Sequence, residues 1–439
     1  MKNWFTISKI LPVFSICFLF ASCAKDDCNT TYTYTNYTPV YMSYDELRSS
    51  VASESPRAFE NPGKIYIIGN YLLINELNEG IHVIDNSDPA NPSFVSFINV
   101  PGNVDMAVQG NHLYADSYTD LVVIDISDPA NASEAGREED VFIDWGSYGY
   151  LPHNDSGVII DWEEELITEV YDGPCDGGQV YYPMIDFGGG IVADVTTGGR
   201  PVTTNGVTGL ESGLTAVNPV TGQGGSMARF TLASGRLYIV GDHDMCVFDI
   251  SSPTDPTKGN TVYLGWGIET IFPYGQNLFI GAMDGMHIMD IANPDNPSHI
   301  STYAHINSCD PVVVDGNYAY VTLRSGTECQ GFTNQLDVVD ISNLYSPSLV
   351  KSFDMFNPHG LGVDSDLLFL CDGTDGLKIF DNNDPLDVGN NLEYHYKNLQ
   401  SYDVIPFNDV LMMIGEDGLF QYDYSDPSNV YKLSEIRVQ

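Results

Sequence analysis

A nine-residue motif recurs seven times in this chain. Each copy is a mostly apolar run that ends in Asp and is followed by a short turn, which in six copies ends in Pro. The copies are IHVIDNSDP (81–89), LVVIDISDP (121–129), MCVFDISSP (245–253), MHIMDIANP (286–294), LDVVDISNL (336–344), LKIFDNNDP (377–385) and LFQYDYSDP (419–427). The Asp residues follow one another at spacings of 40, 124, 41, 50, 41 and 42. A period near 41 with one much longer interval predicts stacked structural units and one long insertion.

The residues inside each repeat predict a four-stranded unit. The run before the Asp is rich in Val, Ile and aromatic residues, which favour a strand. An Asp, Asn or Ser three residues after the anchor Asp starts a turn, and the Pro that follows it ends the strand. An upstream pair of strands meets at short hairpin turns, which are Gly69-Asn70, Gly110-Asn111, Ser234-Gly235, Gly275-Gln276, Gly316-Asn317, Ser365-Asp366 and Asn408-Asp409.

Seven such units predict an all-β fold, a seven-bladed β-propeller of four-stranded antiparallel blades with one insertion between blades 2 and 3. The motif resembles that of the bacterial LVIVD-repeat β-propeller family, as LVVID at 121–125, LDVVD at 336–340 and IHVID at 81–85. The resemblance covers about 63–142 and 224–439. It implies the propeller fold and is nearly silent on function.

The N-terminus predicts export and a lipid anchor. Residues 1–22 have a basic start and an apolar run of 11 residues, which is typical of a signal peptide. Small residues precede Cys23, as in a bacterial lipobox, so Cys23 is the expected lipid attachment site; an ordinary secretory signal is the alternative. Lys25-Asp26-Asp27 resembles the surface-export signal of Bacteroidetes lipoproteins. We therefore expect an outer-membrane lipoprotein at the cell surface, or otherwise on the periplasmic face.

The rest of the chain divides into three expected parts. Residues 23–38 are polar and are expected to be a tether, because they cannot bury enough apolar area to fold alone. Residues 39–62 are expected to be an N-terminal capping segment, which either covers the seam between the first and last blades or lies outside them. The propeller spans 63–439 and contains the insertion at about 143–224. Gly157 to Tyr171 predicts a further β-ribbon, and the Gly-rich stretch after it lacks the residues of a nucleotide-binding loop.

Charge and cysteine content limit the partners. The chain has 60 acidic and 17 basic residues, with a formal net charge of −43, so nucleic acid and anionic lipid are excluded as electrostatic partners. The lipid anchor is the one expected contact with a membrane, and a protein or glycan is the expected partner. A Cys309–Cys329 disulfide is geometrically sensible in the fifth blade, although two free thiols are an alternative and other pairings that involve Cys371 stay open. Cys246 is expected in the core.

Few residues predict chemistry. The sequence contains none of the common hydrolase, zinc or nucleotide motifs, and no cofactor is expected. Asp372 to Gly376 weakly resembles a calcium loop but is better explained as a turn. Polar residues that precede the innermost strands are expected at one mouth of the central channel. They form the candidate ligand site, against the alternative of a solvated rim, and are Asp105, Arg229, Glu269, Asp310, His359 and Asp403.

Within this set, acidic neighbours are expected to favour the charged form of His359. The resulting hypothesis is a noncatalytic binding or scaffolding module at the cell envelope. One alternative is a hydrolase or lyase that acts on an extracellular polymer, with acids at the channel mouth. Another is a structural subunit of a surface complex, with the insertion as its contact.

Overall fold

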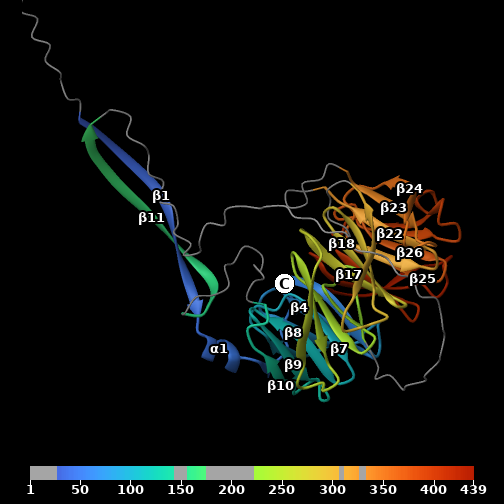
Figure 1. Cartoon of the computed structure of the whole chain (residues 1–439), viewed down its shortest axis with the longest axis horizontal. Coiled ribbons are helices and arrows are strands. Elements are labelled where there is room, and N and C mark those ends of the chain that lie inside the picture. The colour runs from blue at the N-terminus through green and yellow to red at the C-terminus, as the bar shows by residue number, and fades with distance from the viewer. Residues whose placement is uncertain (1–26, 143–155, 175–221, 306–310, 326–332) are drawn as a thin grey trace, which may run out of the picture. The chain divides into compact units, whose positions relative to one another are not determined.

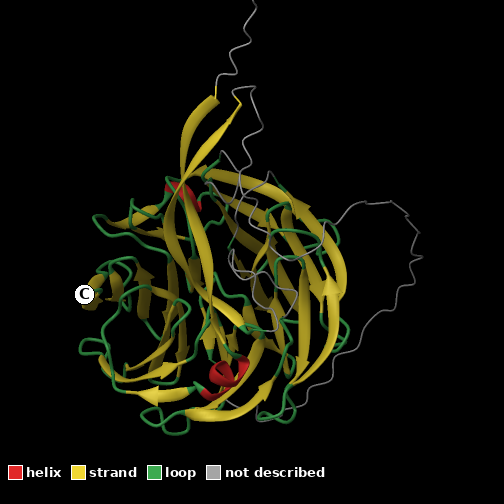
Figure 2. Ribbon diagram, turned by 90° about the vertical axis from the view of Figure 1, so that its left-hand side faces the viewer, coloured by secondary structure: helices red, strands yellow, loops and turns green. Residues whose placement is uncertain are grey.

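The computed structural model describes residues 27–142, 156–174, 222–305, 311–325 and 333–439 (Figure 1). The chain divides into two units. The first comprises Met1–Thr38 and Trp162–Gly213, and the second comprises Pro39–Asp161 and Leu214–Gln439. Strands dominate the described residues, and Figure 2 shows how little helix accompanies them. The chain is therefore all-β, as predicted.

Two long strands, β1 (Asp27–Met42) and β11 (Val158–Pro174), pair in a sheet of their own. The Thr33 and Thr168 hydroxyl oxygens lie 3.3 Å apart, and the Tyr34 hydroxyl donates to Glu169 at 3.3 Å. Residues 27–38, expected to be a tether, are thus part of a strand, because β11 supplies the backbone partners that they lack alone. The predicted ribbon near 157–171 is this β11 strand.

The described part of the second unit contains seven sets of four antiparallel strands. The first two sets are β3 (Pro62–Ile68), β4 (Tyr71–Glu76), β5 (Gly80–Asp85) and β6 (Ser93–Asn99), then β7 (Met106–Gln109), β8 (His112–Ser117), β9 (Asp120–Asp125) and β10 (Ser133–Glu138). The third and fourth are β13 (Phe230–Ala233), β14 (Arg236–Val240), β15 (Asp244–Asp249) and β16 (Thr257–Tyr263), then β17 (Ile268–Tyr274), β18 (Asn277–Ala282), β19 (Gly285–Asp290) and β20 (Ser298–Ala304).

The fifth set is β21 (Val312–Asp315), β22 (Tyr318–Leu323), β23 (Gln335–Asp340) and β24 (Ser348–Asp354). The sixth is β25 (Leu361–Asp364), β26 (Leu367–Cys371), β27 (Leu377–Asp381) and β28 (Leu392–Tyr396). A short 3₁₀ helix, η1 (Val388–Asn390), lies between β27 and β28. The seventh is β29 (Asp403–Phe407), β30 (Val410–Gly415), β31 (Gly418–Asp423) and β32 (Tyr431–Arg437). Each set is one blade, and the last blade takes all four strands from the C-terminal end of the chain.

The first strands of the blades contact one another in chain order, and β29 returns to contact β3. At this junction Ile65, Ile67 and Ile74 of the first blade share an apolar cluster with Ile405 and Ile414 of the last. Burial of such side chains contributes about 1.5–3 kcal/mol each, so apolar packing between blades is the main source of stability. This arrangement is that of a β-propeller, so the predicted all-β fold of four-stranded antiparallel blades is confirmed.

The two predicted turns of each repeat lie together at one end of each blade, which we call the turn face. The first residue of every hairpin turn has a positive φ, between 50° and 62°, at Gly69, Gly110, Ser234, Gly275, Gly316, Ser365 and Asn408. The anchor Asp of every repeat accepts a hydrogen bond from the backbone amide two residues later, at 2.7–2.9 Å. The Asp that recurs in every copy of the motif thus accepts a hydrogen bond that fixes the turn, in addition to ending the strand.

The turn face also fastens neighbouring blades. Ser96 of the first blade donates to the Pro129 carbonyl of the second at 2.6 Å, and Tyr238 of the third donates to the Pro294 carbonyl of the fourth at 2.9 Å. Ser434 of the last blade likewise donates to the Pro89 carbonyl of the first at 2.6 Å. The Pro position therefore both stops its own strand and presents an acceptor to the preceding blade.

The segment before the first blade, residues 39–62, contains α1 (Tyr44–Ser49) and β2 (Ala52–Glu54). Strand β2 pairs with β6 and β10, and so joins the outer strands of the first two blades in one ten-stranded sheet. Further along, Phe59 is buried in the apolar cluster between the last and first blades, and its carbonyl accepts from the Gln439 amide at 3.2 Å. Phe59 thus lies between the last and first blades, whereas β2 lies against the outer strands of the first two.

Helix α1 is attached to the second blade by charge. Arg48 lies 3.0 Å from the fully buried Asp120, which also pairs with Arg137 at 3.0 Å. Two cations thus compensate one buried carboxylate, which satisfies the requirement that a buried charge be paired. No helix within the described ranges has the length and apolar character needed to cross a membrane.

Candidate functional site

The candidate site lies at the opposite end of the blades from the turn face, which we call the loop face. Four polar residues there stand five positions before the first residue of a hairpin turn, at the start of an innermost strand. They are Lys64, Asp105, Arg229 and Asp403. Three of them were predicted from the sequence; Lys64 was missed, although it occupies the same position in the first repeat.

Residues 222–229, which extend from the end of the insertion to the third blade, run along the innermost strands of several blades; we call them the axial segment. Its short strand β12 (Gln223–Gly224) pairs with β3 of the first blade. The Gly222 amide donates to the Val108 carbonyl of the second blade at 3.0 Å. The Ala228 carbonyl accepts from the Ile271 amide of the fourth blade at 2.9 Å. Backbone groups at the centre of the propeller are thus satisfied by this segment.

Ser226 and Met227 of the axial segment bind the last two blades. The Ser226 hydroxyl donates to Asp403 at 3.1 Å and accepts from the Leu361 amide at 2.8 Å. The Met227 amide donates to the other Asp403 oxygen at 3.3 Å. Asp105 of the second blade accepts from the Arg229 amide in the same way. Both carboxylates are only 2% exposed, so they bind the chain's own backbone and do not form an open rim.

Lys64 interacts electrostatically with both of these carboxylates. Its ammonium donates to the Met227 carbonyl. Burial lowers the pKa of Lys64, while the charges of Asp105, Asp403 and Glu269 act to raise it. Burial raises the pKa of Asp403 to about 6 and also raises that of Asp105, and the Lys64 charge opposes both shifts. Desolvation is the larger effect for all three groups, because none of them can be hydrated as it is in water.

Two more residues of the predicted set, Glu269 and Arg229, adjoin this cluster. Glu269 lies at a bulge in β17, where the pairing with β18 shifts register. The Arg229 guanidinium lies 3.5 Å from Asp242 and 3.5 Å from the Ile268 carbonyl. The structure thus brings Asp105, Arg229, Glu269 and Asp403 into one electrostatic group with Lys64.

A further carboxylate, the half-buried Asp116, lies beside Asp105. Its Oδ1 accepts from Asn103 at 2.9 Å, from the Val104 amide at 2.8 Å and from the Asp105 amide at 3.1 Å. Burial, assisted by the neighbouring Asp105 charge, raises the pKa of Asp116 to about 7. A carboxyl that titrates near neutral pH has the acidity of a general acid or base.

The axial segment needs glycines because it packs closely against neighbouring side chains. A Cβ on Gly225 would lie 2.0 Å from Asp403 Oδ2, and one on Gly222 would lie 2.2 Å from the Tyr66 ring. Any larger residue would displace Asp403 or Tyr66. This part of the Gly-rich stretch is therefore explained by close approach of backbone to side chains.

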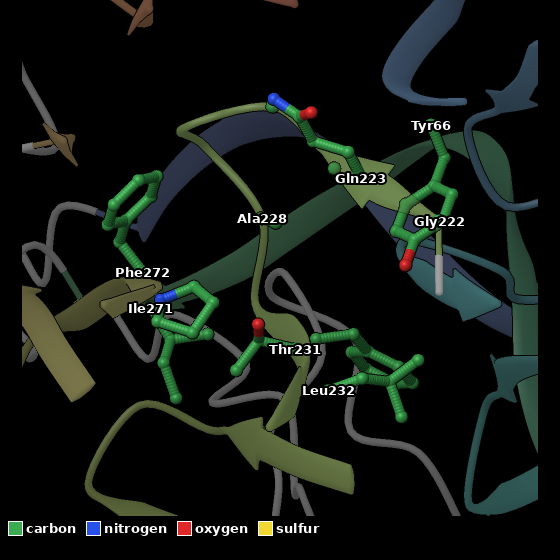
Figure 3. A pocket seen from close by; sticks show the side chains of 12 residues that line it. Tyr66, Gly222, Gln223, Ala228, Thr231, Leu232, Ile271 and Phe272 are labelled. Atoms are coloured by element: carbon green, nitrogen blue, oxygen red, sulfur yellow. The ribbon is translucent and has the colours of Figure 1, made fainter. Parts of the chain in front are cut away.

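A cavity of about 210 Å³ lies beside the axial segment. Figure 3 shows Tyr66 and Gly222 on one side of it and Ile271 and Phe272 on the other. Its walls come from the axial segment and from the innermost strands of the first, third and fourth blades. The volume is below the range of about 300–1,000 Å³ that is usual for small-molecule sites.

His359 differs from the prediction. Its ring lies 3.1 Å from the Asn357 amide nitrogen and 5.6 Å, centre to centre, from Tyr402. Burial, with the nearby Arg324 charge, lowers the pKa of His359 to about 3. The expectation that neighbouring acids favour its charged form is wrong, because desolvation outweighs any attraction to acids at this position.

Several predicted residues lie outside the described residues. These are Cys23, Asp310 and both members of the predicted disulfide, Cys309 and Cys329. Cys246 is buried and reduced, so its predicted place in the core is confirmed. Cys371 is likewise buried and reduced.

The segment from Asp372 to Gly376, which weakly resembles a calcium loop, is a turn between β26 and β27 that is held by an ion pair. Lys378 binds Asp372 and lies 2.8 Å from Asp375. Asp372 also accepts from the Asn357 amide at 2.7 Å. Within the part of the chain that the structure describes, no group of three or more His, Cys, Asp or Glu side chains is arranged to hold a metal ion.

These features define the protein as a β-propeller whose innermost strands are bound by a segment of its own chain. The LVIVD repeat matches it five times, at residues 62–100, 102–140, 232–262, 271–305 and 308–355. The chain therefore carries LVIVD repeats over these residues, and the resemblance predicted from the sequence is confirmed. A search of curated proteins found no match.

Many solved structures resemble this chain in fold. The computationally designed Ika8 protein has a TM-score of 0.50 at 8% identity, over 88% of this chain and 90% of that one. Hsv2 of Kluyveromyces lactis has a TM-score of 0.46 at 9% identity, over 86% and 100%. Dihydro-heme d1 dehydrogenase NirN in complex with DHE has a TM-score of 0.44 at 10% identity, over 88% and 67%. Similarity at this level of identity concerns the fold alone.

Proposed function

We propose that this protein is a noncatalytic binding or scaffolding module of the cell envelope, attached to the outer membrane through a lipid on Cys23. The observation that supports it best is the use of the buried carboxylates. Asp105 and Asp403 are bound by backbone amides of the axial segment, so they hold the fold together at the position where a propeller enzyme would act on a substrate. The functional surface is then the exterior of the loop face.

The binding role is tested by cross-linking on intact cells that carry the full-length protein at its native level, followed by mass spectrometry of what is attached. A defined partner that recurs at a fixed ratio is the expected result. A protein that attaches to nothing above the level of an unrelated lipoprotein would overturn the proposal.

The anchor and location are tested separately. Cys23→Ala should abolish labelling by a palmitate analogue and release the protein from the membrane fraction, whereas Cys28→Ala, a matched control nearby, should change neither. Protease treatment of intact and lysed cells then gives the location, which we propose to be the cell surface. Digestion only after lysis would place the propeller on the periplasmic face.

One observation favours a second candidate, a hydrolase or lyase that acts on an extracellular polymer. The pKa of Asp116, raised to about 7, and that of Asp403, raised to about 6, are near those of general acids. Release of new chain ends from a panel of polysaccharides, abolished by Asp116→Asn, would establish this activity and exclude the noncatalytic proposal. The noncatalytic proposal expects no release by either form.

A further inference from the structure

The loop face carries an exposed pair of aromatic side chains between the third and fourth blades. Tyr263 is 75% exposed and Trp266 is 58% exposed. They belong to residues 263–267, which connect β16 to β17 and which we call the aromatic loop. Exposed Trp and Tyr are the residues that most often dominate binding energy at protein interfaces.

The aromatic loop is held in place on both sides. On one side the Leu264 and Gly265 amides donate to the His243 carbonyl, at 3.0 and 3.3 Å. On the other side the Met283 amide donates to the Gly267 carbonyl at 2.8 Å. Gly267 has a φ of 73°, and a Cβ there would lie 2.5 Å from the Met283 side chain. The loop is therefore fixed before any partner binds, which reduces the entropy lost on association.

Carboxylates stand on the two turns that hold the aromatic loop. Asp242, on the third blade, has a side chain that is 45% exposed, and Asp284, on the fourth, has one that is 64% exposed. Asp242 is partly compensated by Arg229 at 3.5 Å. Asp284 lies 3.4 Å from His287, and burial lowers the pKa of His287, which disfavours a positive charge beside Asp284.

We propose that the aromatic loop docks a basic segment of another protein, with an Arg or Lys side chain over Trp266 and the carboxylates of Asp242 and Asp284 beside it. This inference rests on the proposed binding role and names the chemistry of its partner. A guanidinium over an indole face gains cation–π attraction, and nearby carboxylates add charge-assisted hydrogen bonds.

The charge of the whole chain favours a basic protein over a neutral glycan. With 60 acidic and 17 basic residues, the protein attracts cationic partners at long range and gains nothing toward uncharged sugars. A basic partner therefore predicts binding that weakens with salt, whereas stacking of a sugar on Trp266 does not depend on salt in this way.

The test uses labelled octaarginine as the probe and the detergent-solubilised mature protein, with fluorescence anisotropy as the readout. Trp266→Ala should weaken binding about threefold, in keeping with an exposed cation–π contact. Trp266→Ala combined with Asp284→Asn should weaken it about tenfold. The matched control is Tyr345→Ala, because Tyr345 is 78% exposed but lies in a turn of the opposite face; it should leave binding unchanged. All variants should keep the unfolding midpoint of the wild type, since these side chains are exposed.

Equal affinity of the Trp266→Ala and Tyr345→Ala variants would overturn the proposal and leave only diffuse charge attraction. Competition by neutral cellohexaose, with no loss of affinity between about 50 and about 300 mM NaCl, would replace the basic partner with a glycan. If intact-cell cross-linking recovers a partner while Trp266→Ala has no effect, this surface is excluded and the binding role stands. If no partner is recovered, the binding role itself fails.

Discussion

The turn face and the loop face of the propeller differ in whether their polar contacts repeat from blade to blade. On the turn face, every anchor Asp makes the same hydrogen bond to the amide two residues later, seven times over. On the loop face, several buried charges have partners particular to one blade, as in Arg48 with Asp120 or Lys378 with Asp372. The repeated hydrogen bonds of the turn face thus stabilise the scaffold. The loop face, where contacts differ from blade to blade, is where the chain can acquire a function.

This contrast predicts that the loop face is the more sensitive to small changes. The largest effect is expected for Gly225→Ala, because the added methyl would lie 2.0 Å from the buried Asp403. We expect a loss of about 3 kcal/mol of unfolding free energy, measured by urea titration. Gly69→Ala on the turn face, where nothing lies within 4 Å, should cost only about 1 kcal/mol for its positive φ.

A double-mutant cycle isolates the cause. In the Asp403→Ala background the added methyl of Gly225→Ala has room, so its cost should fall well below the single-variant value. Strictly additive effects would show that Asp403 is not what constrains the axial segment.

The second prediction concerns pH. Because the pKa of Asp403 is raised to about 6 in the folded protein, its carboxyl binds a proton more tightly there than in the unfolded chain. Stability is therefore lost as pH rises from about 4 to about 6, by about 2 kcal/mol from this residue. Asp403→Asn should remove this part of the pH dependence, measured as unfolding free energy at each pH.

His359 supplies a control of opposite sign. Its pKa is lowered to about 3, so the unfolded chain binds the proton more tightly and stability is lost as pH falls below about 6.5. His359→Gln should therefore improve stability at acid pH relative to neutral pH. The same change of slope in both variants would contradict the assigned shifts.

The third prediction concerns a side-chain contact on the turn face, at the junction of the last and first blades. The buried amides of Gln421 and Asn86 exchange hydrogen bonds of 2.9 and 2.7 Å. Gln421→Leu leaves Asn86 without this partner and should cost about 1.5 kcal/mol. Adding Asn86→Leu should recover most of the loss, because both polar groups are then gone; a larger loss in the double variant would show that the pair specifies the junction.

The smallest effect is expected at a repeated turn. Asp125→Ala removes one exposed acceptor of the Ser127 amide, at 2.8 Å, and water can replace it. We expect the thermal midpoint to fall by less than about 2 °C. A drop as large as that of Gly225→Ala would mean that the turn face, and not the loop face, limits stability.

Much of the fold could be predicted because its determinants are local. The alternation of strand and turn, the positive-φ hairpin residues and the Asx turns each depend on residues within a few positions of one another. The tether was the exception: β1 forms because β11, more than a hundred residues away, pairs with it. The polar sequence of residues 27–38 does not indicate a strand partner so distant in the chain.

The candidate site was predicted in part. Position relative to the hairpin turn identified Asp105, Arg229 and Asp403, and the same rule would have found Lys64. The direction of the His359 pKa shift could not be predicted, because it depends on burial and not on the neighbouring residues in the sequence. Ser226 gave no signal at all, since only the path of the axial segment brings it to Asp403.

The sequence by itself determined the repeat, the all-β class and the chemistry of the turn face, because those follow from spacing and from contacts between near neighbours. Only the tertiary structure decided that the end of the insertion lies along the innermost strands and binds the acids there. A carboxylate at the start of a strand can face water, a ligand or the chain itself, and which of these it meets depends on segments far away in sequence. For Asp403 that segment is Gly225 to Met227, and their approach turns an expected ligand-binding residue into part of the core.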